Sequence, residues 1–137
     1  IIFVISEGQI MDTIVYAISI PLSHLNGILA AWGIYISQII VNFFVPSSTG
    51  QAMVMMPILT PLADLSDLSR QVAVHAFTAA DYFGNMIIPT HPTTLACLAI
   101  AGISYDKWFK FVLPMFLKWS AWTFIVLAIG VVTDWAF

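Results

Sequence analysis

Long apolar runs, separated by short polar breaks, follow one another along most of the chain. In residues 9–23 polar side chains recur at helical spacing on one face, and aliphatic side chains occupy the other. This stretch makes about four helical turns and contains Pro21, so it is too short to cross a bilayer. It predicts an interfacial amphipathic helix, with a core helix of the bundle as the alternative.

Two apolar arms surround a polar turn in residues 28–62. The first arm, residues 28–45, is a strong apolar helix pattern, whereas the second, residues 51–62, is much shorter. A spanning helix needs about 20 apolar residues, and a run of about 10–14 suits a re-entrant segment better. We therefore expect a re-entrant helical hairpin with the polar "PSSTG" as its tip. At membrane depth such a tip must be buried in protein or line a wet cavity.

A second interruption divides residues 70–103. A helical pattern runs to Ile88, "IPTHPTT" follows, and a further apolar run ends at Ile103. Pro89 and Pro92 remove backbone donors and disfavour helix in the residue before each of them. Neither part spans comfortably alone and both together do, so we expect one discontinuous transmembrane helix.

The last part of the chain combines lysines with aromatic residues and then becomes uniformly apolar. Residues 104–119 are typical of an interfacial connector anchored at the headgroups, and residues 112–134 are long enough to form a last transmembrane helix. Lys107, Lys110 and Lys118 gather at one boundary. By the positive-inside rule this side is cytoplasmic, and the hairpin then opens from the external side.

Composition supports a membrane protein and excludes other classes. The 137 residues are 61% hydrophobic and 8% charged, with a mean hydropathy of +0.97, which indicates an all-α polytopic membrane protein. A net charge of −3 with four cations argues against a nucleic-acid partner. Cys97 is the lone cysteine, so an internal disulfide is excluded. Because the chain opens at Ile1 within an apolar run, we expect a piece of a longer protein.

The two interruptions are the candidate binding site. A broken helix has unpaired N–H groups at the start of its second half and unpaired carbonyls at the end of its first. These groups attract a small anion and a cation such as Na⁺, respectively. Gly50 would allow close backbone approach or a positive φ. The candidate substrate contacts are Ser47, Ser48, Thr49, Gly50, Thr90, Thr93, Asn42 and Asn85; the candidate ion ligands are Ser47, Gly50, Thr90 and Asp81.

One helix face between the two interruptions carries further polar residues: His75, Thr78, Asp81 and Asn85. Asp81 lies within an apolar run, and an ionisable group inside a membrane segment indicates function by default. The alternative is that Asp81 caps or hydrogen-bonds a neighbouring helix break. His75 and His91 are better explained as structural than as metal ligands, because no second ligand lies at metal spacing. Na⁺ at the two breaks is the metal ion that we expect.

The segments "NFFVPSSTGQAMVMMP" and "NMIIPTHPTTLACLAIAGISYDKWFKF" resemble the C-terminal half of the YfcC/DcuC-type anion carriers of the ion-transporter superfamily. The resemblance covers nearly the whole chain. It implies one half of an inverted repeat, a missing N-terminal repeat, a homodimer in the bacterial inner membrane, and elevator transport. In better-understood relatives a Ser-Asn-Thr tip contacts a carboxylate and tip carbonyls hold Na⁺. Here the matching residues are Ser47, Ser48 and Thr49, so Ser48 departs from that contact set.

These observations predict a secondary active transporter of a small carboxylate or amino acid, with Na⁺ or H⁺ as coupling ion and no other cofactor. Members of the group also include basic amino-acid exchangers, and Asp81 would suit a cationic substrate. A non-transporting membrane subunit is a further alternative. An intramembrane hydrolase using a serine with His91 is disfavoured because the chain has neither a nucleophile-elbow pattern nor H-E-x-x-H. We therefore expect a protein that is not an enzyme.

Overall fold

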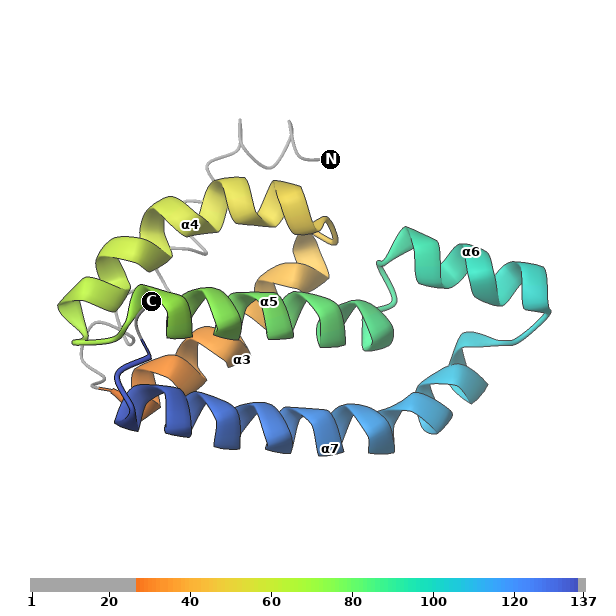
Figure 1. Cartoon of the computed structure of the whole chain (residues 1–137). Helices are drawn as coiled ribbons and strands as arrows, with labels where there is room; N and C mark the ends of the chain where they lie inside the picture. Colours follow the sequence, from red (N-terminus) through yellow and green to blue (C-terminus); the bar gives the residue numbers. More distant parts are fainter. Residues whose placement is uncertain (1–26, 136–137) are drawn as a thin grey trace.

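The computed structural model describes residues 27–135, and within this range the chain is helical without strands (Figure 1). The helices are α3 (Ile28–Phe44), α4 (Ser48–Leu65), α5 (Arg70–Ile87), α6 (Pro92–Ala101) and α7 (Tyr105–Val132). The interfacial helix predicted at residues 9–23 lies outside the described residues. The all-α class expected from the sequence is therefore seen throughout the described part of the chain.

Helices α3 and α4 form an antiparallel hairpin. The backbone N–H of Gly27 donates to the carbonyl of Ser66 at 3.4 Å, so the two open ends of the hairpin lie side by side. At the closed end, Ser47 is the N-cap of α4, and its hydroxyl accepts a hydrogen bond from the Gly50 N–H at 3.4 Å. Helix α4 begins three residues earlier than the apolar arm in the sequence, because the hydroxyl residues of the tip form its first turn.

The second interruption separates α5 from α6. Residues 88–91 leave the helical conformation, and α6 restarts with Pro92 at its first position, where the missing N–H costs nothing. His91 caps α6, since its Nδ1 accepts a hydrogen bond from the Thr94 N–H at 3.4 Å. Gly102 ends α6 with a φ of +66°, a left-handed conformation that glycine adopts without strain.

A single helix, α7, replaces the separate connector and last transmembrane helix expected from residues 104–119 and 112–134. It has 28 residues, which corresponds to a length of about 42 Å. The lysine–aromatic segment is itself helical. The mixture of lysines and aromatic residues therefore lies at the start of α7, and the helix continues through it without a break. Among the described helices, α7 alone is long and apolar enough to cross a membrane.

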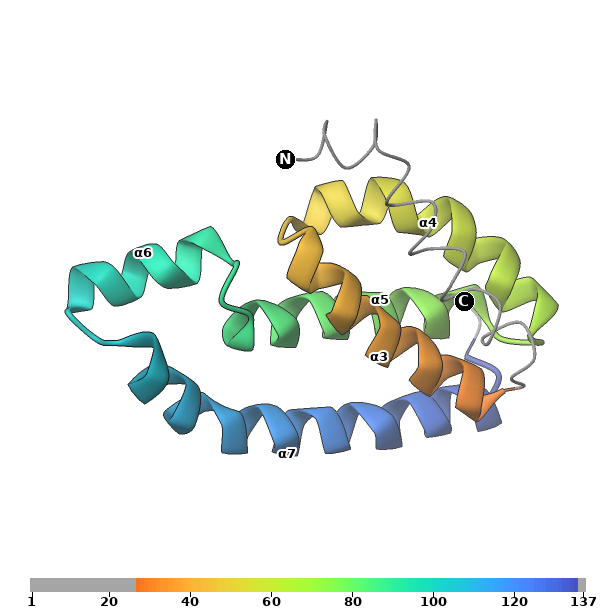
Figure 2. The same cartoon turned by 180° about the vertical axis from the view of Figure 1, so that it is seen from behind.

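The core forms where α3 and α7 pack against α5 (Figures 1 and 2). Ala76, Ala80 and Gly84 are buried at successive i, i+4 positions of α5, and this small-residue face allows the neighbouring helix backbones to approach closely. Buried Tyr35 of α3 exchanges a hydrogen bond with Ser120 of α7, with 2.8 Å between their oxygens. Its ring also packs edge-on against Phe124, 5.3 Å between centroids.

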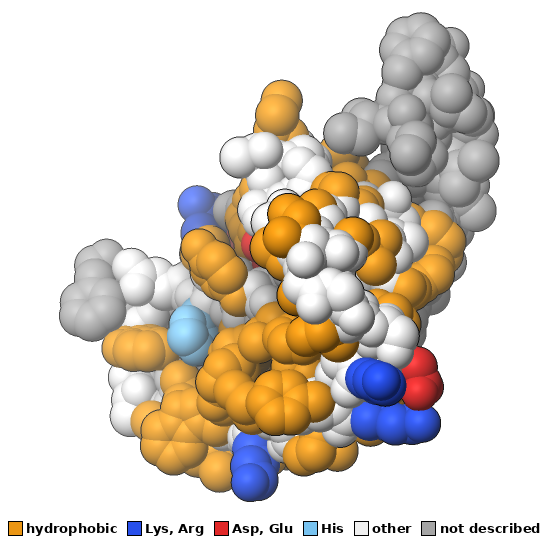
Figure 3. All heavy atoms as spheres, turned by 90° about the vertical axis from the view of Figure 1, so that its right-hand side faces the viewer, with side chains coloured by type: hydrophobic (Ala, Val, Ile, Leu, Met, Phe, Trp, Pro, Cys, Tyr) orange, Lys and Arg blue, Asp and Glu red, His pale blue; other side chains and the backbone are white. Residues whose placement is uncertain are grey.

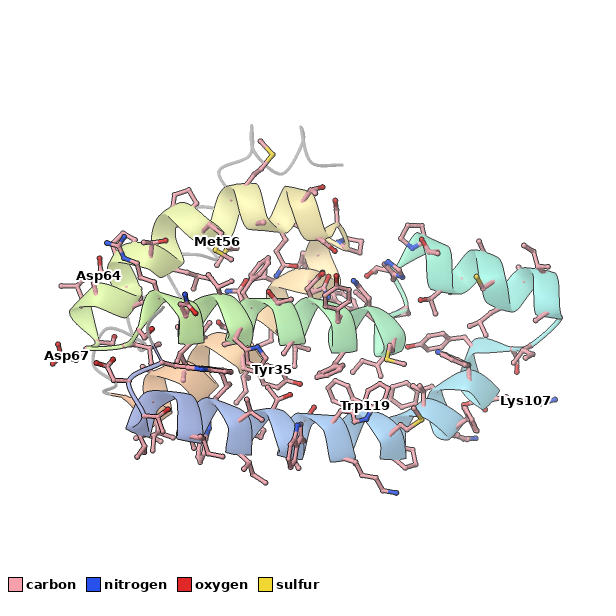
Figure 4. The ribbon with its side chains drawn as sticks, viewed as in Figure 1. Tyr35, Met56, Asp64, Asp67, Lys107 and Trp119 are labelled. Atoms are coloured by element: carbon pink, nitrogen blue, oxygen red, sulfur yellow. The ribbon has the colours of Figure 1, made fainter. Side chains whose placement is uncertain are left out.

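Acidic and basic side chains lie at both ends of the molecule: Arg70 pairs with Asp64 at one end and Lys110 with Asp106 at the other. Asp64 and Asp67 lie at the open end of the hairpin, and Lys107 lies at the far end beyond α6 (Figure 4). Seen from that far end, the surface is mainly hydrophobic, with basic and acidic side chains at its border (Figure 3).

Tyr35→Phe should lower the stability of the bundle by about 0.5–1.5 kcal/mol, because it leaves the buried Ser120 hydroxyl without its partner. Thermal unfolding in detergent micelles, followed by near-UV circular dichroism, measures this. Ser120→Ala should cost a similar amount, and the double variant less than the sum. Tyr82→Phe is the control, because Tyr82 is exposed. Equal midpoints for Tyr35→Phe and Tyr82→Phe would contradict the proposed role of the bond.

Candidate functional site

The two helix interruptions meet near the middle of the molecule. Both ribbon views place the hairpin tip beside the junction between α5 and α6 (Figures 1 and 2). The Thr90 hydroxyl donates to the carbonyl of Phe43 at 2.8 Å and so joins the second interruption to the end of α3. The structure therefore brings together two breaks that are more than 40 residues apart in the sequence.

Asp81 is the charged group at this meeting point, with 3% of its surface exposed. Its Oδ2 accepts a hydrogen bond from the Ser48 hydroxyl at 2.5 Å, and its Oδ1 accepts one from the Asn85 amide at 3.1 Å. The Asn42 amide, fully buried, donates to the backbone carbonyl of Asp81 at 3.1 Å. Side chains of three helices, α3, α4 and α5, thus meet at Asp81: those of Ser48 and Asn85 bond its carboxylate, and that of Asn42 bonds its backbone carbonyl.

Two amide oxygens of this cluster, Oδ1 of Asn42 and Oδ1 of Asn85, are buried without a hydrogen-bond partner among the described residues. A buried polar atom without a partner costs free energy, so each such atom requires an explanation. Both atoms are acceptors, and they lie on side chains that contact a carboxylate-bearing residue. The cluster therefore has more acceptors than donors.

Four backbone carbonyls at the interruptions are already engaged. Thr90 donates to the carbonyl of Phe43, and the Thr94 hydroxyl donates to that of Asn85 at 2.9 Å. From α7, the Trp108 indole N–H donates to the carbonyl of Met86 at 2.9 Å, and the Tyr105 hydroxyl donates to that of Ile87. These bonds satisfy carbonyls that lack partners within a helix that stops. The sequence predicted such carbonyls as cation ligands, and in the structure side chains occupy them.

The remaining predicted residues are distributed around this cluster. Ser47 caps α4, and Thr49 is exposed in its first turn. Gly50 is a helical residue of that turn, and the glycines with positive φ in the described part of the chain are Gly27 and Gly102. Of the two alternatives given for Gly50, close backbone approach or a positive φ, the second is absent, because the helix begins early enough to include this residue.

Among the described residues, no hydrogen bond joins the Thr93 side chain to the Asp81 cluster. It is exposed and lines a hollow of about 350 Å³ between α6 and α7, together with Cys97 and Trp108. Its neighbour Thr94 bonds the carbonyl of Asn85 and the His91 ring. The sequence could not distinguish the two threonines, because their direction depends on where α6 begins.

His75 and Thr78 lie on the same helix as Asp81 but border a separate hollow. With Arg70, Gln71, Val74 and Trp135 they line a cavity of about 520 Å³ toward the start of α5. The His75 ring packs edge-on against Trp135, 5.9 Å between centroids, and the Thr78 hydroxyl donates to the carbonyl of Val74. One helix face therefore serves two regions of the molecule.

Two glutamines form a polar contact that was not assigned to the site from the sequence. The fully buried Gln51 donates from Nε2 to both the carbonyl and the Oε1 of Gln38, at 3.0 Å each. Gln38 lies one helical turn before Asn42, so amides at i and i+4 in an apolar helix were the available signal. This contact holds the two arms of the hairpin together near the tip.

The strongest ion pair lies away from the site. Arg70 donates from Nε and one terminal nitrogen to the two carboxylate oxygens of Asp64, at 2.9 and 2.7 Å, on the exposed open end of the hairpin. These hydrogen bonds from the guanidinium lower the pKa of the Asp64 carboxyl.

Within the described residues no group of three or more His, Cys, Asp or Glu side chains could hold a metal ion.

Comparisons with known proteins identify relatives of the chain. Residues 1–133 match the family described as C4-dicarboxylate anaerobic carrier, DcuC. The chain is 38% identical over 104 residues to the Escherichia coli (strain K12) protein named "Putative basic amino acid antiporter YfcC", covering 76% of this chain and 21% of that protein. It is 36% identical over 112 residues to an "Uncharacterized protein" of Haemophilus influenzae, covering 82% of this chain and 22% of that protein.

The chain therefore spans about a fifth of the length of these relatives. No solved structure matches the chain.

Gly84→Ala should disturb the cluster, because a Cβ at this position would lie 2.7 Å from Nδ2 of the buried Asn42. The expected loss of stability is about 1–3 kcal/mol, as for other overpacked positions. Thermal unfolding in micelles measures it. Asn42→Ala in the Gly84→Ala background removes the obstructing amide, so the cost of Gly84→Ala should be smaller there than in the parent protein. The same cost in both backgrounds would show that the obstruction lies elsewhere.

Proposed function

The chain belongs to the C4-dicarboxylate anaerobic carrier family, and we propose that it forms one inverted-repeat half of a secondary active transporter. The substrate is a small carboxylate or amino acid, carried with Na⁺ or H⁺. The observation that carries this proposal is the meeting of two helix interruptions at the buried carboxylate of Asp81. Ionisable groups within membrane segments mark substrate and ion pathways, and interrupted helices form binding sites near the midplane of transporters.

Helix starts supply the groups that would hold a carboxylate. Helices α4 and α6 both begin at the interruptions, and the first N–H groups of a helix lack carbonyl partners within it. Together with the positive end of the helix dipole, they favour an anion. Ser47 and His91 cap one N–H each, at Gly50 and Thr94. We propose the remaining N–H groups of Ser48, Thr49 and Thr93, with the nearby hydroxyls, as substrate contacts.

A basic amino acid is the second candidate substrate. Asp81 gives the site a negative charge that would attract an ammonium or guanidinium group and repel the second carboxylate of a dicarboxylate. The Escherichia coli relative carries the name "Putative basic amino acid antiporter YfcC". An amino acid satisfies both features of the site, since its carboxylate suits a helix start and its positive charge suits Asp81.

We propose that the α3–α4 hairpin is re-entrant and that its tip lies near the membrane midplane. Helix α6 continues for ten residues beyond the interruption at which the tip lies, which corresponds to about 15 Å, or half of a hydrocarbon core of about 30 Å. We further propose that the protein is a homodimer in the bacterial inner membrane and that it transports by an elevator motion. The missing repeat would form the second wall of the site. The four-fifths of the relatives' length outside this chain leaves room for the other repeat.

The topology predicts opposite labelling of the two charged ends of the molecule. In a Cys97→Ser background, a single cysteine at the exposed Leu65 should react with an impermeant maleimide from one side of the membrane. A cysteine at Asp106 should react only from the other, because α5 and α6 lie between them. Labelling of both positions from the same side would contradict a continuous path of α5 and α6 across the bilayer.

Transport itself is tested with the full-length protein in proteoliposomes, by uptake of radiolabelled succinate and arginine under Na⁺ or proton gradients. Ser48→Ala removes a hydrogen bond to the Asp81 carboxylate and should lower kcat/KM by about tenfold or more. Thr60→Ala is the matched control, since its hydroxyl bonds Met56 of the same helix, away from the tip. Absence of uptake for every carboxylate and amino acid tried would overturn the transporter proposal.

A further inference from the structure

We infer that Asp81, Asn42 and Asn85 form a binding site for a dehydrated monovalent cation of the size of Na⁺, built from side-chain oxygens of α3 and α5. This inference rests on the proposed function and specifies where the coupling ion binds. It differs from the expectation that backbone carbonyls at the interruptions hold the ion. The Ser48 hydroxyl, which donates to Asp81, links the ion site to the hairpin tip.

Four of the backbone carbonyls at the interruptions are poor candidates because they have other partners. Hydroxyls of Thr90 and Thr94 bond the carbonyls of Phe43 and Asn85, and α7 side chains bond those of Met86 and Ile87. A cation there would have to compete with these hydrogen bonds. The buried side-chain oxygens without a partner near Asp81 are the amide oxygens of Asn42 and Asn85, and that of Gln51 lies further along the hairpin, beside Gln38.

Hydrogen bonding fixes which amide atoms are free. The Asn42 nitrogen lies 3.1 Å from the carbonyl oxygen of Asp81, and the Asn85 nitrogen lies 3.1 Å from Oδ1 of Asp81. Turning either amide over would place its oxygen against another oxygen, which is repulsive. Both free atoms are therefore oxygens, and a ligand of these atoms must be a cation or a hydrogen-bond donor.

Size and charge favour a bare ion. Both amide oxygens are buried and receive no hydrogen bond from the described residues, so a ligand there would be a small donor such as water or ammonium, or a cation. A dehydrated alkali cation approaches oxygen ligands more closely than such a donor does, and hard cations prefer oxygen ligands. The ion pairs of the described residues, Arg70–Asp64 and Lys110–Asp106, are exposed and neither includes Asp81, so a cation at Asp81 would not displace an existing ion-pair partner.

Binding of the ion would also order the hairpin tip. Ser48 holds Asp81 from the first turn of α4, and Asn42 holds it from the last turns of α3. A cation at Asp81 therefore stabilises the arrangement in which both arms of the hairpin contact α5. Substrate contacts at the same tip would then bind more tightly when the ion is present, and the ion more tightly with substrate.

The experiment measures thermal unfolding of the full-length protein in detergent without substrate, as NaCl replaces choline chloride at constant ionic strength. We expect Na⁺ to raise the midpoint in a saturable manner and K⁺ to raise it less at equal concentration. Asp81→Asn and Asn85→Ala should each increase the half-saturating Na⁺ concentration at least tenfold. Asp64→Asn, which removes an exposed carboxylate, should leave this concentration unchanged. If Asp81→Asn does not fold, the partly exposed Asn85→Ala provides the same test.

A midpoint that responds equally to Na⁺ and choline would overturn the inference, as would an unchanged Na⁺ response in Asp81→Asn and Asn85→Ala. The second result would locate the ion elsewhere. Uptake assays separate this inference from the proposed function. Substrate uptake without any Na⁺ effect on unfolding leaves the transporter and removes the Na⁺ site. A Na⁺ effect that depends on Asp81, without uptake of any substrate, leaves the site and removes the transporter.

Discussion

Backbone groups freed by an interrupted helix must find partners within an apolar bundle, because no bulk water is available to them there. In this protein α5 stops at Ile87, and hydroxyl and indole groups of Thr94, Tyr105 and Trp108 take the carbonyls of its last turn. Two of these partners come from the start of α7. The path of α7 alongside α5, and the sharp turn after α6, therefore follow from the need to satisfy this helix end.

The same requirement explains the position of the hairpin. Its tip lies where Thr90 can bond the last carbonyls of α3 and where Ser48 can bond Asp81. Close approach of α3 to α5 depends on small residues, and Gly84 leaves room for the Asn42 amide that no larger side chain would leave. The buried Asp81 is thus held by polar atoms of three helices: its carboxylate by Ser48 and Asn85, and its backbone carbonyl by Asn42. Such an arrangement is costly unless the charge is used, which connects the packing to the proposed ion and substrate site.

Much of this organisation was predictable from residue types. The apolar runs, the hydroxyl-rich interruptions and the isolated Asp81 indicated helices, breaks and a polar site within a membrane protein. Other features were not predictable. Gly50 was expected to allow close backbone approach or a positive φ, and the positive φ is absent because the helix starts at Ser48 and includes this residue. His75 and Thr78 share a face with Asp81, yet they border a different hollow, because neighbouring helices cover only part of α5.

The sequence by itself determined the membrane class, the helical periodicity and the chemical nature of the interruptions, because hydropathy, proline and hydroxyl residues act locally. Only the tertiary structure decided which polar atoms meet. Contacts between helices far apart in the chain decide three features of the site. They decide whether Thr93 or Thr94 joins it, whether the carbonyls at the helix ends have partners, and which amide oxygens lack a donor. Hydrogen-bond satisfaction is a property of that packing, and no local pattern of residues contains it.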